Sequence, residues 1–188
     1  MSTIIRFIID MLPYMLITVP IHVLVRLMIL RKNKLNLPRE AAMLLFVMFI
    51  VGLMSQAVIP EIRITDWQIH VINDGVHTTN LIPGKVFADT YKEVARGNTA
   101  ALLINFLGNI VMFIPIGFFV KLLWDVSGAK AILAGLFTSM FIEVSQLFLA
   151  RSSDVDDLLL NTAGAAIGVL FFVMLNRIAP KFTSKFQK

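Results

Sequence analysis

The chain has 188 residues, of which 57% are hydrophobic and only 15% are charged, and its formal net charge is +5. Because a soluble domain carries about 25% charged residues, this composition excludes an ordinary soluble protein and predicts an all-α integral membrane protein. The absence of cysteine excludes disulfides, thiolate metal sites and a cysteine nucleophile. We expect neither a cleavable signal peptide nor a nucleic-acid partner.

Five apolar segments are long enough to cross a hydrocarbon core, which needs about 20 helical residues. We expect these spans at residues 4–30, 40–59, 100–124, 130–150 and 157–178. The chain thus divides into two amino-terminal transmembrane helices (1–59), an extracellular loop (60–99), a three-helix core (100–178) and a basic cytoplasmic tail (179–188).

The distribution of Lys and Arg predicts the orientation of these spans. Ten of these residues flank the loops on one side, and five lie on the other, four of those in the long loop at 60–99. Since positive residues concentrate on the cytoplasmic side, we expect the amino terminus outside, the carboxyl terminus inside, and insertion in a bacterial cytoplasmic membrane.

The long loop carries signals of a short β-hairpin. Residues 63–72 alternate loosely between apolar and polar, and Asn73-Asp74-Gly75 is a turn signal before 76–82. After Pro83-Gly84, residues 85–94 form an amphipathic stretch. Aromatic residues such as Phe87 and Tyr91 are expected at the level of the lipid headgroups.

Polar residues gather where the third, fourth and fifth spans approach the outer surface. Glu143 is seven residues from the expected end of its span, about 10 Å deep at 1.5 Å per residue. Ionisable groups in membranes are costly and commonly functional, so we predict a polar outer-leaflet site. Its candidate ligand-binding residues are Asn105, Asn109, Glu143, Gln146, Arg151, Asp154, Asp157 and Asn161.

Most of these residues also have a purely structural interpretation. Asp154 is a candidate N-cap of the fifth span, and Asp156 and Asp157 are acids suited to its first turn. Asn105 and Asn109 can join helices by hydrogen bonds. A buried Glu143 can pair with Arg151, and the small residues of Gly164-Ala-Ala-Ile-Gly168 predict close helix packing.

Four pieces of the sequence together resemble the VanZ-like family of small bacterial membrane proteins. They are Asn80-Leu-Ile-Pro83, the stretch from Asn105 to Gly117, Glu143-Val-Ser-Gln146, and the stretch from Arg151 to Gly164. Gly84 departs from the pattern, since the family usually has phenylalanine there. The resemblance implies lowered sensitivity to teicoplanin and related lipoglycopeptides, and it implies no established biochemical activity.

Two functions fit this pattern. In the first, a binding protein holds a lipid headgroup, a lipid-linked envelope precursor or a lipoglycopeptide anchor, with Arg151 recognising phosphate and amides orienting the ligand. In the second, a membrane-embedded enzyme acts on a lipid-linked phosphate or sugar, with Glu143 as its acid or base. No cofactor is expected, although Asp154 and Asp157 could then hold a divalent cation. The number of amides favours binding over catalysis.

Overall fold

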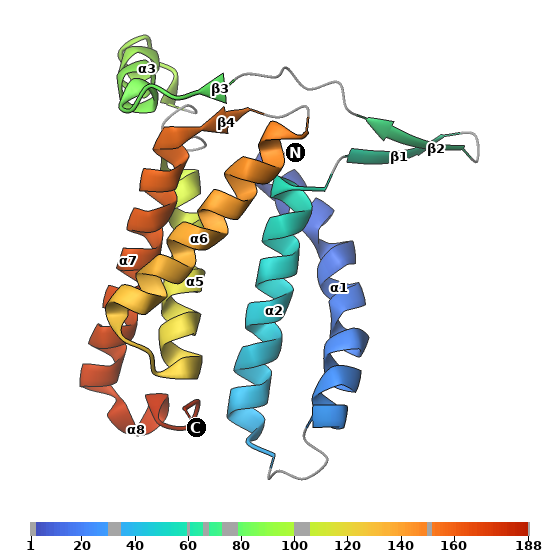
Figure 1. Cartoon of the computed structure of the whole chain (residues 1–188), viewed down its shortest axis with the longest axis vertical. Helices are drawn as coiled ribbons and strands as arrows, with labels where there is room; N and C mark the ends of the chain where they lie inside the picture. Colours follow the sequence, from blue (N-terminus) through green and yellow to red (C-terminus); the bar gives the residue numbers. More distant parts are fainter. Residues whose placement is uncertain are drawn as a thin grey trace.

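The computed structural model describes residues 3–29, 35–59, 61–65, 68–72, 79–99, 106–149 and 152–187. Most of them are helical, and five long helices run side by side as a bundle (Figure 1). These helices are α1 (Thr3–Ile29), α2 (Leu37–Ala57), α5 (Gly108–Trp124), α6 (Gly128–Leu147) and α7 (Val155–Ile178). The two ends of the chain lie at opposite ends of this bundle (Figure 1).

Four of the described helices, α1, α2, α6 and α7, are long and apolar enough to cross a membrane. The expected third span is shorter, because its described helix α5 has 17 residues. At 1.5 Å per residue α5 is about 26 Å long, slightly less than a hydrocarbon core of about 30 Å. The prediction of about five spans is therefore supported for four helices, with α5 as a shorter apolar helix.

Local capping explains where the helices begin. Asn36, Ser127 and Asp154 each accept a hydrogen bond from a backbone N–H in the first turn of α2, α6 and α7. Such side chains satisfy amides that a helix leaves unpaired at its start. The predicted starts of these three spans were two or three residues late, since hydropathy does not register a polar cap.

Glycines bring α5 and α7 into close contact. A Cβ atom on Gly168 would lie 2.0 Å from the carbonyl oxygen of Ile114, and one on Gly117 would lie 1.9 Å from that of Ala165. Gly164 approaches the carbonyl oxygen of Ile110 in the same way. The predicted packing role of the small-residue motif is confirmed, because any larger residue would force these backbones apart.

Two small sheets lie at the end of the bundle where the chain begins (Figure 1). Strands β1 (Glu61–Thr65) and β2 (Gln68–Ile72) pair antiparallel, while β3 (Thr79–Asn80) pairs in parallel with β4 (Ser153–Asp154). The hairpin predicted around the turn at 73–75 was misplaced, because the observed pairing lies entirely before it. Residues 73–78 themselves lie outside the described residues.

The amphipathic stretch after Gly84 forms the helix α3 (Lys85–Ala95), which lies across the same end of the bundle as β3 and β4 (Figure 1). Phe87 of α3 packs edge-to-face against Phe106, which precedes α5, with ring centroids 5.2 Å apart. Tyr91, in contrast, is largely exposed. The helix thus sits on the bundle with part of its apolar surface uncovered.

A buried arginine secures the opposite end of the bundle. Arg39, at the start of α2, donates hydrogen bonds to the backbone oxygens of Leu123 and Phe186. Leu123 belongs to the last turn of α5, and Phe186 follows the short helix α8 (Pro180–Thr183). A cation is favoured at the carboxyl end of a helix, where the helix dipole is negative. Arg39 therefore stabilises the end of α5 and also holds the basic tail against the bundle.

Candidate functional site

Glu143 supports the turn that joins α6 to α7. Its Oε2 accepts hydrogen bonds from the hydroxyl of Ser153 at 2.9 Å and from the backbone N–H of Asp154 at 2.8 Å, and the residue is only 7% exposed. Because α6 ends at Leu147, Glu143 is four residues from the helix end, or about 6 Å. This distance to the helix end is shorter than the expected 10 Å or so, because the predicted span continued to residue 150.

Asp154 holds two elements together. As the N-cap of α7 it accepts a hydrogen bond from the backbone N–H of Asp156 at 2.9 Å, which confirms the structural interpretation of this residue. Both of its carboxylate oxygens also accept from the side-chain amide of Asn80, at 2.9 and 3.0 Å. The sequence marks Asn80 only as part of a family motif and gives no signal of this contact.

Asp156 caps a helix other than its own. It is fully buried, and its two carboxylate oxygens accept from the backbone N–H groups of Gly84 and Val86, at 2.7 and 2.8 Å. These amides belong to the start of α3, whose N-cap Gly84 offers no side chain. The φ of Gly84 is +87°, a left-handed conformation that suits glycine. From the sequence, Asp156 was predicted only to be an acid in the first turn of its own helix.

Asp157 and Asn109 join α7 to α5. The side-chain amide of Asn109 donates to Oδ1 of Asp157 at 2.5 Å. The carboxylates of Glu143, Asp154 and Asp156 all lie near enough to Asp157 to repel its charge. Four carboxylates, from α6 and from the beginning of α7 with its N-cap, therefore gather at this end of the bundle, and the amide of Asn109 on α5 contacts one of them.

A second polar pair lies one helical turn deeper. Asn161 follows Asp157 by four residues, and Ser139 precedes Glu143 by four, so each continues its neighbour's helix face. The amide of Asn161 donates to the hydroxyl of Ser139 at 2.8 Å, and both residues are buried. Oδ1 of Asn161 is buried without a hydrogen-bond partner, an arrangement that costs about 1–3 kcal/mol. We call Glu143, Asp157, Asn109 and Asn161 the acceptor layer.

The remaining predicted site residues are placed differently or lie outside the described residues. The side-chain amide of Gln146 donates to the backbone oxygen of Ala57 at 3.4 Å, so it links α6 to the end of α2. Asn105 and Arg151 lie outside the described residues, as does the proposed pairing of Arg151 with Glu143. Within the described residues, no three His, Asp or Glu side chains are grouped to hold a metal ion.

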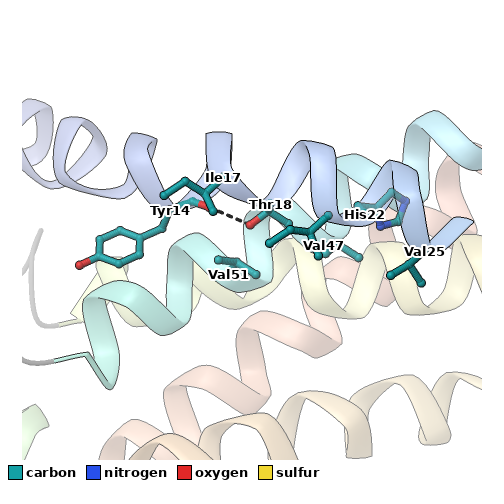
Figure 2. Close-up of a pocket in the computed structure, with 8 residues that line it drawn as sticks. Tyr14, Ile17, Thr18, His22, Val25, Val47 and Val51 are labelled. Carbon is teal, nitrogen blue, oxygen red and sulfur yellow. Dashed lines mark hydrogen bonds between the residues drawn. The ribbon is translucent and has the colours of Figure 1, made fainter.

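An apolar groove of about 490 Å³ lies on other helices, between α1 and α2 (Figure 2). Thr18 lies within it and donates its hydroxyl hydrogen to the backbone oxygen of Tyr14. His22 lines the groove, and its Nε2 is buried with no hydrogen-bond partner among the described residues. The residues that line the groove are mostly apolar, and none of them belongs to the acceptor layer.

Apolar helices long enough to cross a bilayer, with carboxylates and amides gathered at one end, define a multi-pass membrane protein with a polar site near the ends of its spans. The family model of VanZ/LLP1 matches residues 15–176, and the chain belongs to this family. The match includes every residue of the acceptor layer, and it confirms the resemblance that the sequence motifs carry. No curated protein and no solved structure matches the chain.

Proposed function

We propose that this protein binds the headgroup of an envelope lipid, a lipid-linked precursor or a lipoglycopeptide anchor at the acceptor layer. By doing so it lowers the sensitivity of the cell to teicoplanin-type antibiotics. The observation that carries the proposal is the convergence of Asn109, Glu143 and Asp157 from three apolar helices, above an unpaired buried acceptor on Asn161.

The hydrogen bonds separate polar residues that hold the fold together from polar residues that could bind a ligand. Asp154 and Asp156 use both carboxylate oxygens on protein donors and hold β3 and α3 in place. Within the described part of the chain, Oε1 of Glu143 and Oδ2 of Asp157 receive no hydrogen bond. Ionisable groups in membranes are functional candidates by default, and these two retain capacity for a ligand.

The predicted orientation places this layer where such a ligand is found. Lys and Arg counts favour an outer position for the end of the bundle that carries α3 and the acceptor layer. In a bacterial cytoplasmic membrane, that is the surface at which lipid-linked precursors are used and lipoglycopeptides act. The family membership supports the antibiotic phenotype, since it is the phenotype linked to VanZ-like proteins.

The alternative is a membrane-embedded enzyme that uses Glu143 as acid or base. Its proposed divalent cation would need Asp154 as a ligand, but both oxygens of this side chain accept hydrogen bonds from Asn80. Oε2 of Glu143 is likewise engaged by Ser153 and a backbone amide. These contacts favour recognition over acid–base chemistry.

The test is antibiotic sensitivity in a bacterium that expresses the chain from a plasmid. We expect Asp157→Asn, which preserves shape but removes charge, to abolish the protection that the native chain gives against teicoplanin. Asp89→Asn serves as a matched control, because Asp89 is an exposed acid on α3 away from the acceptor layer. Protection by Asp157→Asn equal to that of the native chain, at equal membrane abundance, would contradict the proposal.

A further inference from the structure

The geometry points to a protonated amine as the ligand group that enters the acceptor layer. This inference rests on the proposed function and names the chemistry that the site selects. It follows from three properties of the described residues: the sign of the local charge, the kind of hydrogen-bonding atoms left over, and the burial of one of those atoms.

Among the described residues, the ionisable side chains at the site are all acidic. Glu143, Asp154 and Asp156 each lie near enough to repel the charge of Asp157, and Asp154 also repels that of Glu143. Among the described residues, the ion pairs formed by Lys and Arg all lie elsewhere; they are Arg26–Glu40, Lys92–Asp89, Arg96–Glu93 and Lys121–Asp125. An anionic ligand group would be repelled by this cluster, whereas a cation would be attracted to it.

The atoms that remain for a ligand are acceptors. In the hydrogen bonds between described residues, three oxygens of Glu143, Asp157 and Asn161 receive no donor: Oε1 of Glu143, Oδ2 of Asp157 and Oδ1 of Asn161. An ammonium group carries three donors and no acceptor. It therefore matches both the charge and the hydrogen-bonding character of these oxygens, which a phosphate does not.

Asn161 supplies an observation independent of the acids. It is neutral, 4% exposed, and its Oδ1 lacks a partner. Helical side chains lean toward the amino terminus of their helix, so Asn161 leans toward Asp157 and the acidic end of α7. A buried acceptor is normally paired, and a donor from a ligand that enters beside Asp157 would supply the bond that Oδ1 of Asn161 lacks.

Two envelope components present this chemistry beside a lipid anchor. One is a phospholipid with an amine in its headgroup, and the other is a lipid-linked precursor whose peptide carries a free amine. Both place an ammonium group near the membrane surface, at the level of the acceptor layer. The structure assigns the shared ammonium, and the binding experiment separates the two sources.

The experiment is native mass spectrometry of the full chain in detergent, titrated with dioleoyl phosphatidylethanolamine and with its N-acetylated form. N-acetylation keeps the phosphate and removes the cation. We expect the amine lipid to bind at least tenfold more tightly, and Asp157→Asn to remove that preference while Asp89→Asn retains it. A lipid-linked pentapeptide with a free lysine amine, and its N-acetylated form, provide the second pair of probes.

Each outcome decides the inference. Preference for the free amine in either pair supports it and identifies the source as the phospholipid or the precursor. Equal binding of free and acetylated forms overturns the inference but leaves a headgroup site in place. If none of the four probes binds, both the inference and the proposal that the acceptor layer binds these lipid headgroups are overturned. If Mg²⁺ alone suppresses the binding of the amine, the acceptor layer is a metal site and the inference is overturned.

Discussion

The contact between Asp156 and α3 makes the most specific prediction about how this end of the molecule is held together. Asp156→Asn keeps the size of the side chain but replaces one accepting oxygen by an NH₂ group. That group would face the N–H of Gly84 or Val86, which now donate at 2.7 and 2.8 Å. One bond is lost, and the other no longer has a charged acceptor.

The magnitude follows from the two bonds. Hydrogen bonds to a charged group contribute about 1.5–3 kcal/mol each, so losing one and weakening the other should cost about 3 kcal/mol. Since 1.4 kcal/mol corresponds to tenfold, the opening equilibrium of α3 should rise roughly a hundredfold. Because Gly84 provides no cap of its own, nothing within α3 compensates for this loss.

Amide hydrogen exchange measures this opening directly. In Asp156→Asn, the amides at the start of α3 should exchange roughly a hundredfold faster, while amides in the middle of α7 remain protected. Asp89→Asn is the control, since the side chain of Asp89 is 53% exposed in an i,i+3 pair with Lys92 and such pairs contribute little. Unchanged exchange at Gly84 and Val86 would refute the capping role, and uniform acceleration across all helices would instead indicate global destabilisation.

Three further predictions concern the fold. Gly117→Ala should lower the free energy of unfolding in detergent by about 3 kcal/mol, because the new methyl meets a backbone oxygen at 1.9 Å. Gly128→Ala is the control and should be tolerated, because its methyl meets only a side-chain methyl at 3.3 Å. Equal stability of the two variants would contradict the packing account. Arg39→Ala should expose the carboxyl-terminal tail to proteolysis, because it removes two bonds to backbone oxygens, and an unchanged cleavage rate would contradict this. A single cysteine in place of the exposed Lys85 should be labelled from outside intact cells. A single cysteine in place of the exposed Lys181 should be labelled only after the membrane is permeabilised. The reverse pattern would put the acceptor layer on the cytoplasmic side.

The helical architecture could be predicted from the sequence, because it depends on the hydropathy and residue types of each segment. Long apolar runs predict spans by length, and α1, α2, α6 and α7 match the predicted segments to within about three residues at either end. The N-cap role of Asp154 and the packing of Gly164 and Gly168 were likewise predicted, since each depends on residue type and spacing along one helix. The family resemblance rested on the same stretches.

The hydrogen bonds of the site could not be predicted from the sequence, because they join residues that are distant along the chain. Asp156 lies 72 positions from Gly84, and Asn80 lies 74 from Asp154. Nothing along α7 distinguishes an acid that caps its own helix from one that caps another. The N-cap glycine at 84 was a usable signal: a helix that begins without a capping side chain needs an acceptor from elsewhere.

The orientation of Gln146 shows a related limit. Its spacing from Glu143 placed it on nearly the same helix face, and it was therefore predicted to share the site. In the structure its amide reaches the backbone oxygen of Ala57 at the end of α2. A long side chain at the edge of a face can serve a neighbouring helix, and helical spacing alone does not decide which partner it reaches.

The central claim is that the acceptor layer holds a ligand, and the most direct test is native mass spectrometry of protein extracted from its membrane in mild detergent. We predict a co-purifying lipid or lipid-linked precursor on the native chain that is absent from Asp157→Asn and retained on Asp89→Asn. A native chain that carries no adduct, or an adduct equally abundant on Asp157→Asn, would contradict the account and assign these carboxylates to the architecture of the bundle alone.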